Sequence, residues 1–392
     1  DGRSFVRRTD HTYDLVIYAL VDSLVLHSGY SSLRLESFLF TEEAFRDIKA
    51  KLKPNGVFAL YNGYRQGWLV GRLEAMVTEV FGHKPLVMSL PYRPAIGPGD
   101  LTQDITFVLV GNGANSAVEG IRKSFDERGL FWAHRKPRVN ASINGYGPEP
   151  PATVGSRPGD WSKIGPARVD TTGSGRLPSD DWPFPYLREA SIPGLNLRGM
   201  AIVAIASLAI LFWFAPDRTL RPNGQMFFLG AGFMLLETKG VVHMALLFGS
   251  TWIVNSVVFL AILVMILCSN LYVLGFKPRR LWPYTILLVA SLLANTVVPM
   301  SYFLALPGLG KVVASCAVIF VPIFFAGVIF AAAFRDSQHP DVDFSSNIAG
   351  VILGGLSENL SLMLGFNHLL LVALAFYLLS ALLRPRFQPA PA

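Results

Sequence analysis

The second half of this chain consists mostly of apolar segments that are long enough to cross, or nearly cross, a lipid bilayer. A helix needs about 20 apolar residues to span the hydrocarbon core, since each residue adds about 1.5 Å to its length. Seven segments of this kind follow Arg198: residues 199–215, 225–248, 252–275, 282–305, 312–334, 346–363 and 367–383. The sequence therefore predicts an all-α transmembrane bundle of about seven helices over residues 197–384, with the lipid bilayer as its partner.

The composition agrees with a membrane protein and argues against two other classes of protein. Hydrophobic residues make up 52% of the chain and charged residues only 16%. The net charge of +7 could indicate nucleic-acid binding, but the basic residues are scattered through loops, so we expect no nucleic acid. The cysteines lie in apolar runs, and neither they nor the histidines have the spacing of metal ligands, so we expect no metal site.

Strands and helices alternate in residues 1–112. Residues 13–21 form a short run rich in Val, Ile and Tyr, which predicts a fully buried parallel strand, and further strands are expected at 57–61 and 105–110. Helices are expected after Thr41, which is a suitable N-cap, and at 68–81. This order predicts the second half of an α/β doubly wound sheet, whose ligands would bind at the carboxyl ends of its strands.

Residues 113–196 differ in character from the segments on either side. A helix is expected at 116–128, and the Pro- and Gly-rich stretches at 145–151 and 171–175 predict a linker without regular structure. The linker ends with Asp180 and Asp181, followed by three aromatic residues. Two interpretations of this end remain open: an aromatic belt at the level of the lipid headgroups, or an acidic lip that closes over a cationic substrate.

The run Tyr13-Asp-Leu-Val-Ile-Tyr-Ala-Leu-Val-Asp-Ser23 resembles the active-site strand of a spermidine synthase. Glu36-Ser-Phe-Leu-Phe-Thr-Glu-Glu-Ala-Phe45 and Leu52-Lys-Pro-Asn-Gly-Val57 are similar to the helix and turn that follow in that family, so the resemblance covers about the first 110 residues. It implies a Rossmann-like methyltransferase fold that binds S-adenosylmethionine or its decarboxylated form. The implied reaction transfers an aminopropyl or methyl group to an amine or a lipid-borne acceptor.

The same resemblance assigns roles to individual residues. Asp1 and Gly2 match the family's Asp-Gly motif, which contacts the adenine, so the chain would begin inside the domain. Ala19 and Leu20 would lie against the cofactor, but Ala19 replaces the acid that helps to deprotonate the attacking amine. Asp22 retains the second carboxylate and would orient the amine by a charge-assisted hydrogen bond, although a turn cap is the alternative.

His27 lies five residues beyond Asp22 and is the candidate for the missing base, because the pKa of histidine lies near neutrality. The alternative is that His27 is a solvent-exposed loop residue without a catalytic role. Whether the domain is an enzyme therefore stays open from the sequence.

The apolar segment at 225–248 contains three ionisable residues, Glu237, Lys239 and His243. Such groups are costly in the hydrocarbon core and usually face a bundle interior or water. Glu237 and Lys239 are two residues apart, point to different sides of a helix, and so would need partners on other segments, for which Glu358, Asn347 and Asn255 are the candidates. These residues favour a second hypothesis, a transporter or exporter of a cationic small molecule whose nucleoside-sensing domain is inactive; in a third, the bundle only anchors the domain at a lipid substrate.

Bacterial membrane proteins that resemble spermidine synthase have similar Asp-Asp-Trp-Pro-Phe and Leu-Leu-Glu-Thr-Lys stretches, and this resemblance implies a location in the bacterial inner membrane.

The orientation predicted from the cofactor conflicts with the distribution of charge. A cytosolic nucleoside would place the first domain inside, yet many basic residues then fall outside, against the positive-inside rule. They are Arg218, Arg221, Lys277, Arg279, Arg280, Arg335, Arg384 and Arg386. A re-entrant pair at 225–248 would remove the conflict and is our expectation; an outward-facing domain is the alternative.

Overall fold

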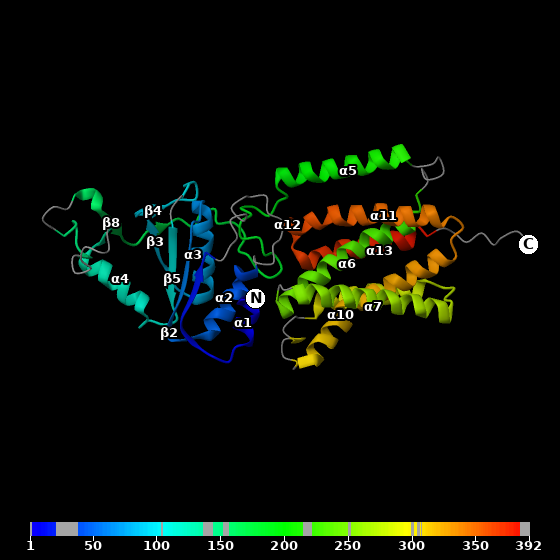
Figure 1. Cartoon of the computed structure of the whole chain (residues 1–392), viewed down its shortest axis with the longest axis horizontal. Helices are drawn as coiled ribbons and strands as arrows, with labels where there is room; N and C mark the ends of the chain where they lie inside the picture. The colour runs from blue at the N-terminus through cyan, green and yellow to red at the C-terminus, as the bar shows by residue number, and fades with distance from the viewer. Residues whose placement is uncertain are drawn as a thin grey trace, which may run out of the picture. The chain divides into compact units, whose positions relative to one another are not determined.

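The computed structural model describes residues 2–20, 38–102, 105–135, 144–151, 157–214, 222–249, 252–298, 302–303, 306 and 308–384. The chain forms two compact units, Gly2–Ala190 and Ser191–Ala392, and each is treated by itself below (Figure 1). The first unit is mixed α/β, whereas the described residues of the second are almost entirely helical.

A four-stranded sheet with the order β1-β2-β5-β3 lies at the centre of the first unit. Its strands are β1 (Tyr13–Ala19), β2 (Leu52–Asn62), β5 (Ile105–Gly111) and β3 (Leu86–Leu90). β1 and β2 are parallel, whereas β5 is antiparallel to both of its neighbours. The strands expected at 13–21, 57–61 and 105–110 are thus present, but β3 was not predicted. No helix joins β3 to β5, so the chain returns antiparallel.

Helices cover both faces of this sheet (Figure 1). One face packs against α2 (Glu42–Lys51) and α3 (Gly67–Phe81), and the other against α4 (Ala117–Arg128). The first unit also contains α1 (Gly2–Arg8). The predicted N-cap of α2 is confirmed, because the hydroxyl of Thr41 accepts a hydrogen bond from the Ala44 amide at 3.2 Å.

Strand β1 is less buried than the sequence predicts. Val16 and Tyr18 pack against the core under α2 and α3, but Leu15 and Ile17, which point to the other face, are 50% and 51% exposed. The prediction of a fully buried strand is therefore wrong for the described residues. The reason is that α4 packs on the other three strands of the sheet, at Val57, Met88 and Leu109 among others, and not on β1.

The segment predicted as an irregular linker contains a small sheet of its own. Strands β6 (Phe131–His134), β7 (Gly145–Tyr146) and β8 (Trp161–Ile164) pair in the order β7-β6-β8, and the short helix η4 (Pro158–Asp160) precedes β8. Tyr146 packs its ring against Phe131 and Phe125, with centroids 5.0 and 5.5 Å away. These aromatic contacts outweigh the weak strand propensity of the glycine-rich stretch. Two further short strands, β4 (Ala95–Ile96) and β9 (Arg168–Val169), pair in parallel.

The second unit confirms that the predicted apolar segments form helices, although the helix in the segment 282–305 ends at Val297. Its elements are α5 (Gly194–Phe214), α6 (Gly224–Phe248), α7 (Trp252–Phe276), α8 (Trp282–Val297), α10 (Gly308–Arg335), α11 (Pro340–Ser357), η6 (Glu358–Leu360), α12 (Ser361–Leu364) and α13 (Phe366–Leu382). Four helical stretches are long and apolar enough to cross a membrane: Gly224–Phe248, Asn255–Phe276, Gly310–Arg335 and Pro340–Leu364. The length and the apolar composition of these helices are those of a membrane protein.

Helix α6 is one continuous helix of 25 residues. The expected re-entrant pair at 225–248 is therefore wrong. It cannot explain why the orientation expected from a cytosolic nucleoside disagrees with the positive-inside rule. Lys239, one of the ionisable residues of α6, donates a hydrogen bond to Asn367 on α13, and the neighbouring Thr238 donates one to Glu358 of η6.

The sequence has small residues at four-residue spacing in residues 347–355, which predicts close helix packing, and these residues do let α6 and α11 approach closely. A Cβ at Gly350 would overlap the carbonyl group of Phe227, and one at Gly354 would lie 2.5 Å from the carbonyl oxygen of Ala231. On α6, a Cβ at Gly230 would overlap the carbonyl oxygen of Asn347. The packing role expected for these residues is confirmed.

Candidate functional site

The carboxyl ends of the parallel strands β1 and β2 meet at one edge of the sheet. Ala19 pairs with Tyr61 in the strand register, and the amide of Leu20 donates a hydrogen bond to the carbonyl oxygen of Tyr61 at 3.2 Å. Leu20 has a φ of 48°, so the chain leaves β1 in the left-handed region. Beside it, a Cβ at Gly63 would meet no atom within 4 Å. This edge is the place where ligands bind in open α/β sheets.

The predicted cofactor and catalytic residues are only partly covered by the structure. Asp1, Asp22 and His27 lie outside the described residues. Gly2 is the first residue of α1, and Ala19 and Leu20 form the exposed end of β1. The geometry therefore supports an accessible strand end at Ala19, while the roles expected for Asp22 and His27 stay predictions.

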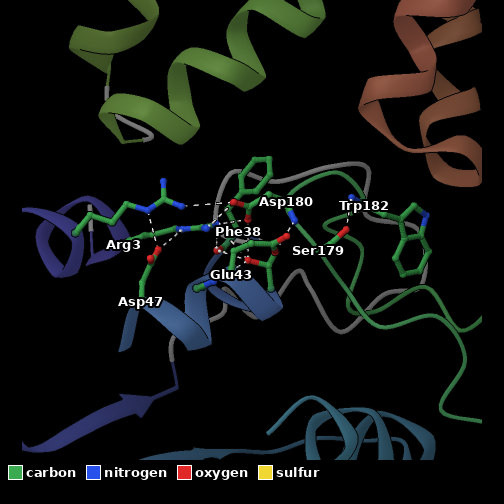
Figure 2. A network of polar contacts seen from close by, with 10 residues as sticks. Arg3, Phe38, Glu43, Asp47, Ser179, Asp180 and Trp182 are labelled. Atoms are coloured by element: carbon green, nitrogen blue, oxygen red, sulfur yellow. Dashed lines mark hydrogen bonds and ion pairs between the residues drawn. The ribbon is translucent and has the colours of Figure 1, made fainter. Parts of the chain in front are cut away.

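Asp180 is held by a network of polar contacts that sequence reasoning missed (Figure 2). Arg3 donates two hydrogen bonds to its carboxylate, with Nη1–Oδ1 and Nη2–Oδ2 distances of 2.5 and 2.6 Å. Thr41 also donates to Oδ1 at 2.8 Å, and Arg7 Nη2 lies 3.4 Å from Oδ2. Two guanidinium groups neutralise the charge of Asp180, so this residue stabilises the contact between its loop and α1. It does not offer a free carboxylate to a cationic substrate.

The same network reaches α2 through two more acids. Glu43 accepts a hydrogen bond from the Asp180 amide at 2.9 Å, and burial, reinforced by the Asp180 charge, raises the pKa of the Glu43 carboxyl. Asp47 pairs with Arg7, with 2.7 Å between Oδ2 and Nε. The i,i+4 spacing of Arg3 and Arg7 in the sequence places them on one face of α1 and is the signal that could have found this network.

Asp181 differs from Asp180. Its carboxylate lies 3.9 Å from Arg176 Nη2 and remains partly exposed. Trp182, the next residue, is completely buried and stacks edge-on against Phe184. Within the first unit, the aromatic residues Trp182 and Phe184 thus belong to a folded core, which disfavours the interpretation of this stretch as a headgroup-level belt.

Arg72 is a second buried organising residue that the sequence analysis missed. It lies on α3 with 0% exposure, and its guanidinium donates hydrogen bonds of 2.7–2.8 Å to the carbonyl oxygens of Ser174, Pro185, Leu187 and Arg188. It also lies over the ring of Trp68, 4.8 Å from the centroid. Burial lowers the pKa of Arg72 to about 10, so the side chain stays charged at neutral pH. Its signal in the sequence is that it is the only basic residue of a mostly apolar helix.

Polar side chains of the second unit gather where α6 meets η6 and α13. Lys239, 3% exposed, donates a hydrogen bond of 2.7 Å to the side-chain oxygen of Asn367. Thr238 donates to the carboxylate of Glu358 at 3.4 Å. Among the described residues, neither Glu237 nor Glu358 forms an ion pair with a basic side chain. The expected partner Glu358 thus joins the α6 cluster, through Thr238.

Of the other expected partners, Asn347 contacts α6 elsewhere, because its side chain donates to the carbonyl oxygen of Met226 at 3.0 Å. The side-chain oxygen of Asn255 is buried without a hydrogen-bond partner among the described residues. Two features thus remain as candidates for function: the strand end at Ala19 and the carboxylates beside α6. Comparison of the chain with family models, curated proteins and solved structures found no match.

Proposed function

We propose that the chain is a membrane-anchored transferase of the spermidine synthase type. It would bind S-adenosylmethionine or its decarboxylated form and transfer an aminopropyl or methyl group to an amine or a lipid-borne acceptor. The observation that carries the proposal is the accessible carboxyl edge of β1 and β2, where Ala19 is exposed and Gly63 leaves open space. A nucleoside fits such an edge because neither residue fills it.

The topology of the sheet also supports this proposal. In an all-parallel sheet, each strand would need a crossover helix, whereas here β5 runs antiparallel between β2 and β3. The methyltransferase fold implied by the resemblance has an antiparallel strand of this kind near one end of an otherwise parallel sheet.

The bound nucleoside would supply a sulfonium whose adjacent carbon accepts the nucleophile. The attacking nitrogen would form a bond to that carbon while the carbon–sulfur bond broke, and the electron pair of that bond would stay on sulfur as a thioether. The nitrogen must also lose a proton, and Ala19 cannot take it. We assign the orientation of the amine to Asp22 and the proton to His27, whose ordinary pKa suits a base at neutral pH.

The proposal is tested with the purified full-length chain and two acid-to-amide variants that flank the same strand. Asp22→Asn should lower turnover roughly 10- to 100-fold, because a hydrogen bond to a charged group contributes about 1.5–3 kcal/mol. Asp14→Asn is the matched control, since Asp14 sits at the other end of β1 in an exposed ion pair with Lys53. Nucleoside binding is measured by calorimetry in parallel.

A chain that binds neither nucleoside would overturn the proposal, as would equal turnover in the two variants. Because the assay uses purified protein, its outcome does not depend on membrane orientation. In the cell, the proposal requires the first unit to face the cytosol. Because α6 is one continuous helix, Arg279 and Arg335, which lie near helix ends, would then face outward. This arrangement goes against the positive-inside rule, by which basic residues are enriched on the cytoplasmic side.

A second function, movement of a cation through the bundle, is favoured by one observation. The carboxylates of Glu237 and Glu358 lie in candidate spans, and neither is neutralised by an ion pair among the described residues. Intramembrane carboxylates usually mark ion or proton paths. In proteoliposomes, Glu237→Gln should abolish uptake of a polyamine such as spermidine, whereas Asp341→Asn, an exposed change in the first turn of α11, should not. Equal uptake by wild type and Glu237→Gln would refute this function.

A further inference from the structure

A cavity lies among four helices of the second unit, α6, α8, α10 and α13. It encloses about 220 Å³, more than the roughly 150 Å³ of an apolar cavity known to take up benzene. Half of its lining residues are aliphatic: Leu229, Leu281, Ile286, Leu288, Ile329 and Ala381. A space of this kind suits an apolar chain better than a polar solute.

One buried polar group in this lining lacks a hydrogen-bond partner among the described residues. Tyr377 of α13 is 2% exposed, and its hydroxyl is buried with no hydrogen-bond partner among the described residues. Its ring is held in place by Gly232 of α6, where a Cβ would lie 2.8 Å from the ring carbons. A buried, unpaired hydroxyl is unfavourable, and a ligand oxygen in the cavity would satisfy it. The neighbouring Ser380, by contrast, already donates to the carbonyl oxygen of Gln225 at 2.9 Å.

The cavity adjoins a wider and more polar pocket at one end of the bundle, and the two share Gln225, Leu281 and Arg384. Two acids of this pocket are already engaged: Asp336 pairs with Arg335 at 2.7 Å, and Asp343 accepts a hydrogen bond of 2.7 Å from Asn223. The pocket also contains His339.

The polar pocket forms the mouth of the cavity, and two arginines carry positive charge in it. Arg279 and Arg384 both line the polar pocket, and neither lies within hydrogen-bond or ion-pair distance of a described acid. Arg384 still acts on Asp336 at longer range, because the hydrogen bond from Arg335 lowers the pKa of that carboxyl and the charge of Arg384 adds to this effect. Arg384 lies seven residues beyond Tyr377 in the sequence and two residues past the end of α13. The site thus combines positive charge at its mouth, an unpaired hydroxyl on α13, and an apolar interior.

We propose that this cavity and its mouth bind one anionic phospholipid of the surrounding bilayer. One acyl chain enters between α6, α8, α10 and α13, the phosphate lies against Arg384 and Arg279, and Tyr377 donates a hydrogen bond to a lipid oxygen such as an ester carbonyl. The phospholipid is the occupant that the surroundings favour, because α6 and α10 are candidate membrane spans. This inference is independent of the proposed transferase reaction.

The experiment measures lipid binding to the full-length chain in detergent by native mass spectrometry, with phosphatidylglycerol and phosphatidylcholine as probes. We expect wild type to retain phosphatidylglycerol in preference to phosphatidylcholine. Arg384→Gln should weaken retention of phosphatidylglycerol about tenfold, which is the loss expected for one charge-assisted contact. Arg280→Gln is the matched control, since Arg280 is exposed at the same end of the bundle but lines neither pocket. Equal losses in the two variants would overturn the proposal.

Two further variants separate the parts of the site. Ala381→Trp, at a lining position of the cavity, should expel the acyl chain and abolish retention while the protein remains folded. Tyr377→Phe should weaken lipid retention but raise the melting temperature of the lipid-free protein, because it removes an unpaired buried hydroxyl. Retention of phosphatidylglycerol by Ala381→Trp, or equal retention of both lipids by wild type, would refute the site.

Discussion

Replacing Arg72 by alanine should release residues 174–188 from α3 and destabilise that segment by roughly 1–3 kcal/mol, the range for leaving a buried hydrogen-bond acceptor without its donor. The guanidinium is the common donor to four carbonyl oxygens of this segment, which has little regular structure of its own. Without the donor, those carbonyls must find water, and the buried ring of Trp182 loses a cationic neighbour 5.8 Å away.

Hydrogen exchange of the full-length chain, followed by mass spectrometry, measures this loss directly as faster exchange in residues 174–188. Arg72→Lys should fall between wild type and Arg72→Ala, because an ammonium keeps the charge but not the fork of donors. Arg46→Ala serves as the control, since its ion pair with Glu42 is exposed and should contribute less than about 1 kcal/mol. Unchanged exchange in Arg72→Ala would show that the segment is held by other contacts.

Substitution of Gly350 by alanine should separate α6 from α11 and lower the stability of the bundle by at least about 1–3 kcal/mol. The added methyl group would overlap the carbonyl group of Phe227, which belongs to the helical backbone and cannot rotate away as a side chain can. The neighbouring close approach at Gly354, against Ala231, would open with it.

The chain offers a closely matched control five residues away. A Cβ at Gly355 would meet no atom within 4 Å, so Gly355→Ala should leave stability unchanged or raise it slightly through better helix propensity. Thermal unfolding in one detergent compares the two variants. Equal melting temperatures would mean that the two helices adjust by a small shift, and that the small-residue spacing does not determine their packing.

The parts of the fold that the sequence predicted are those specified by neighbouring residues. The helix after Thr41 was predicted because its cap and first-turn acids lie within four residues of each other. The apolar segments of the second unit were predicted because burial in lipid needs only length and hydropathy. The close packing of Gly350 was predicted for a similar reason, since small residues at helical spacing are visible in a single segment.

The parts that escaped prediction depend on distant residues. Arg3 and Asp180 are 177 residues apart, and Arg72 is more than 100 residues from each carbonyl it binds. No local pattern marks such a pair. The direction of β5 depends on pairing with β3, a five-residue strand whose apolar run is too short to distinguish from a loop. For the candidate site, the sequence predicted where β1 ends, but the uncovered face of that strand depends on where α4 packs.

The uncovered side of β1 has a practical consequence for anyone who prepares the first unit. Among the described strands, β1 pairs only with β2, so one row of its backbone N–H and C=O groups has no strand partner, beside the half-exposed Leu15 and Ile17. An edge of this kind is a template for another strand. Concentrated samples of the isolated unit would tend to associate edge to edge, and a lysine at position 15 or 17 would be the natural way to keep them monodisperse.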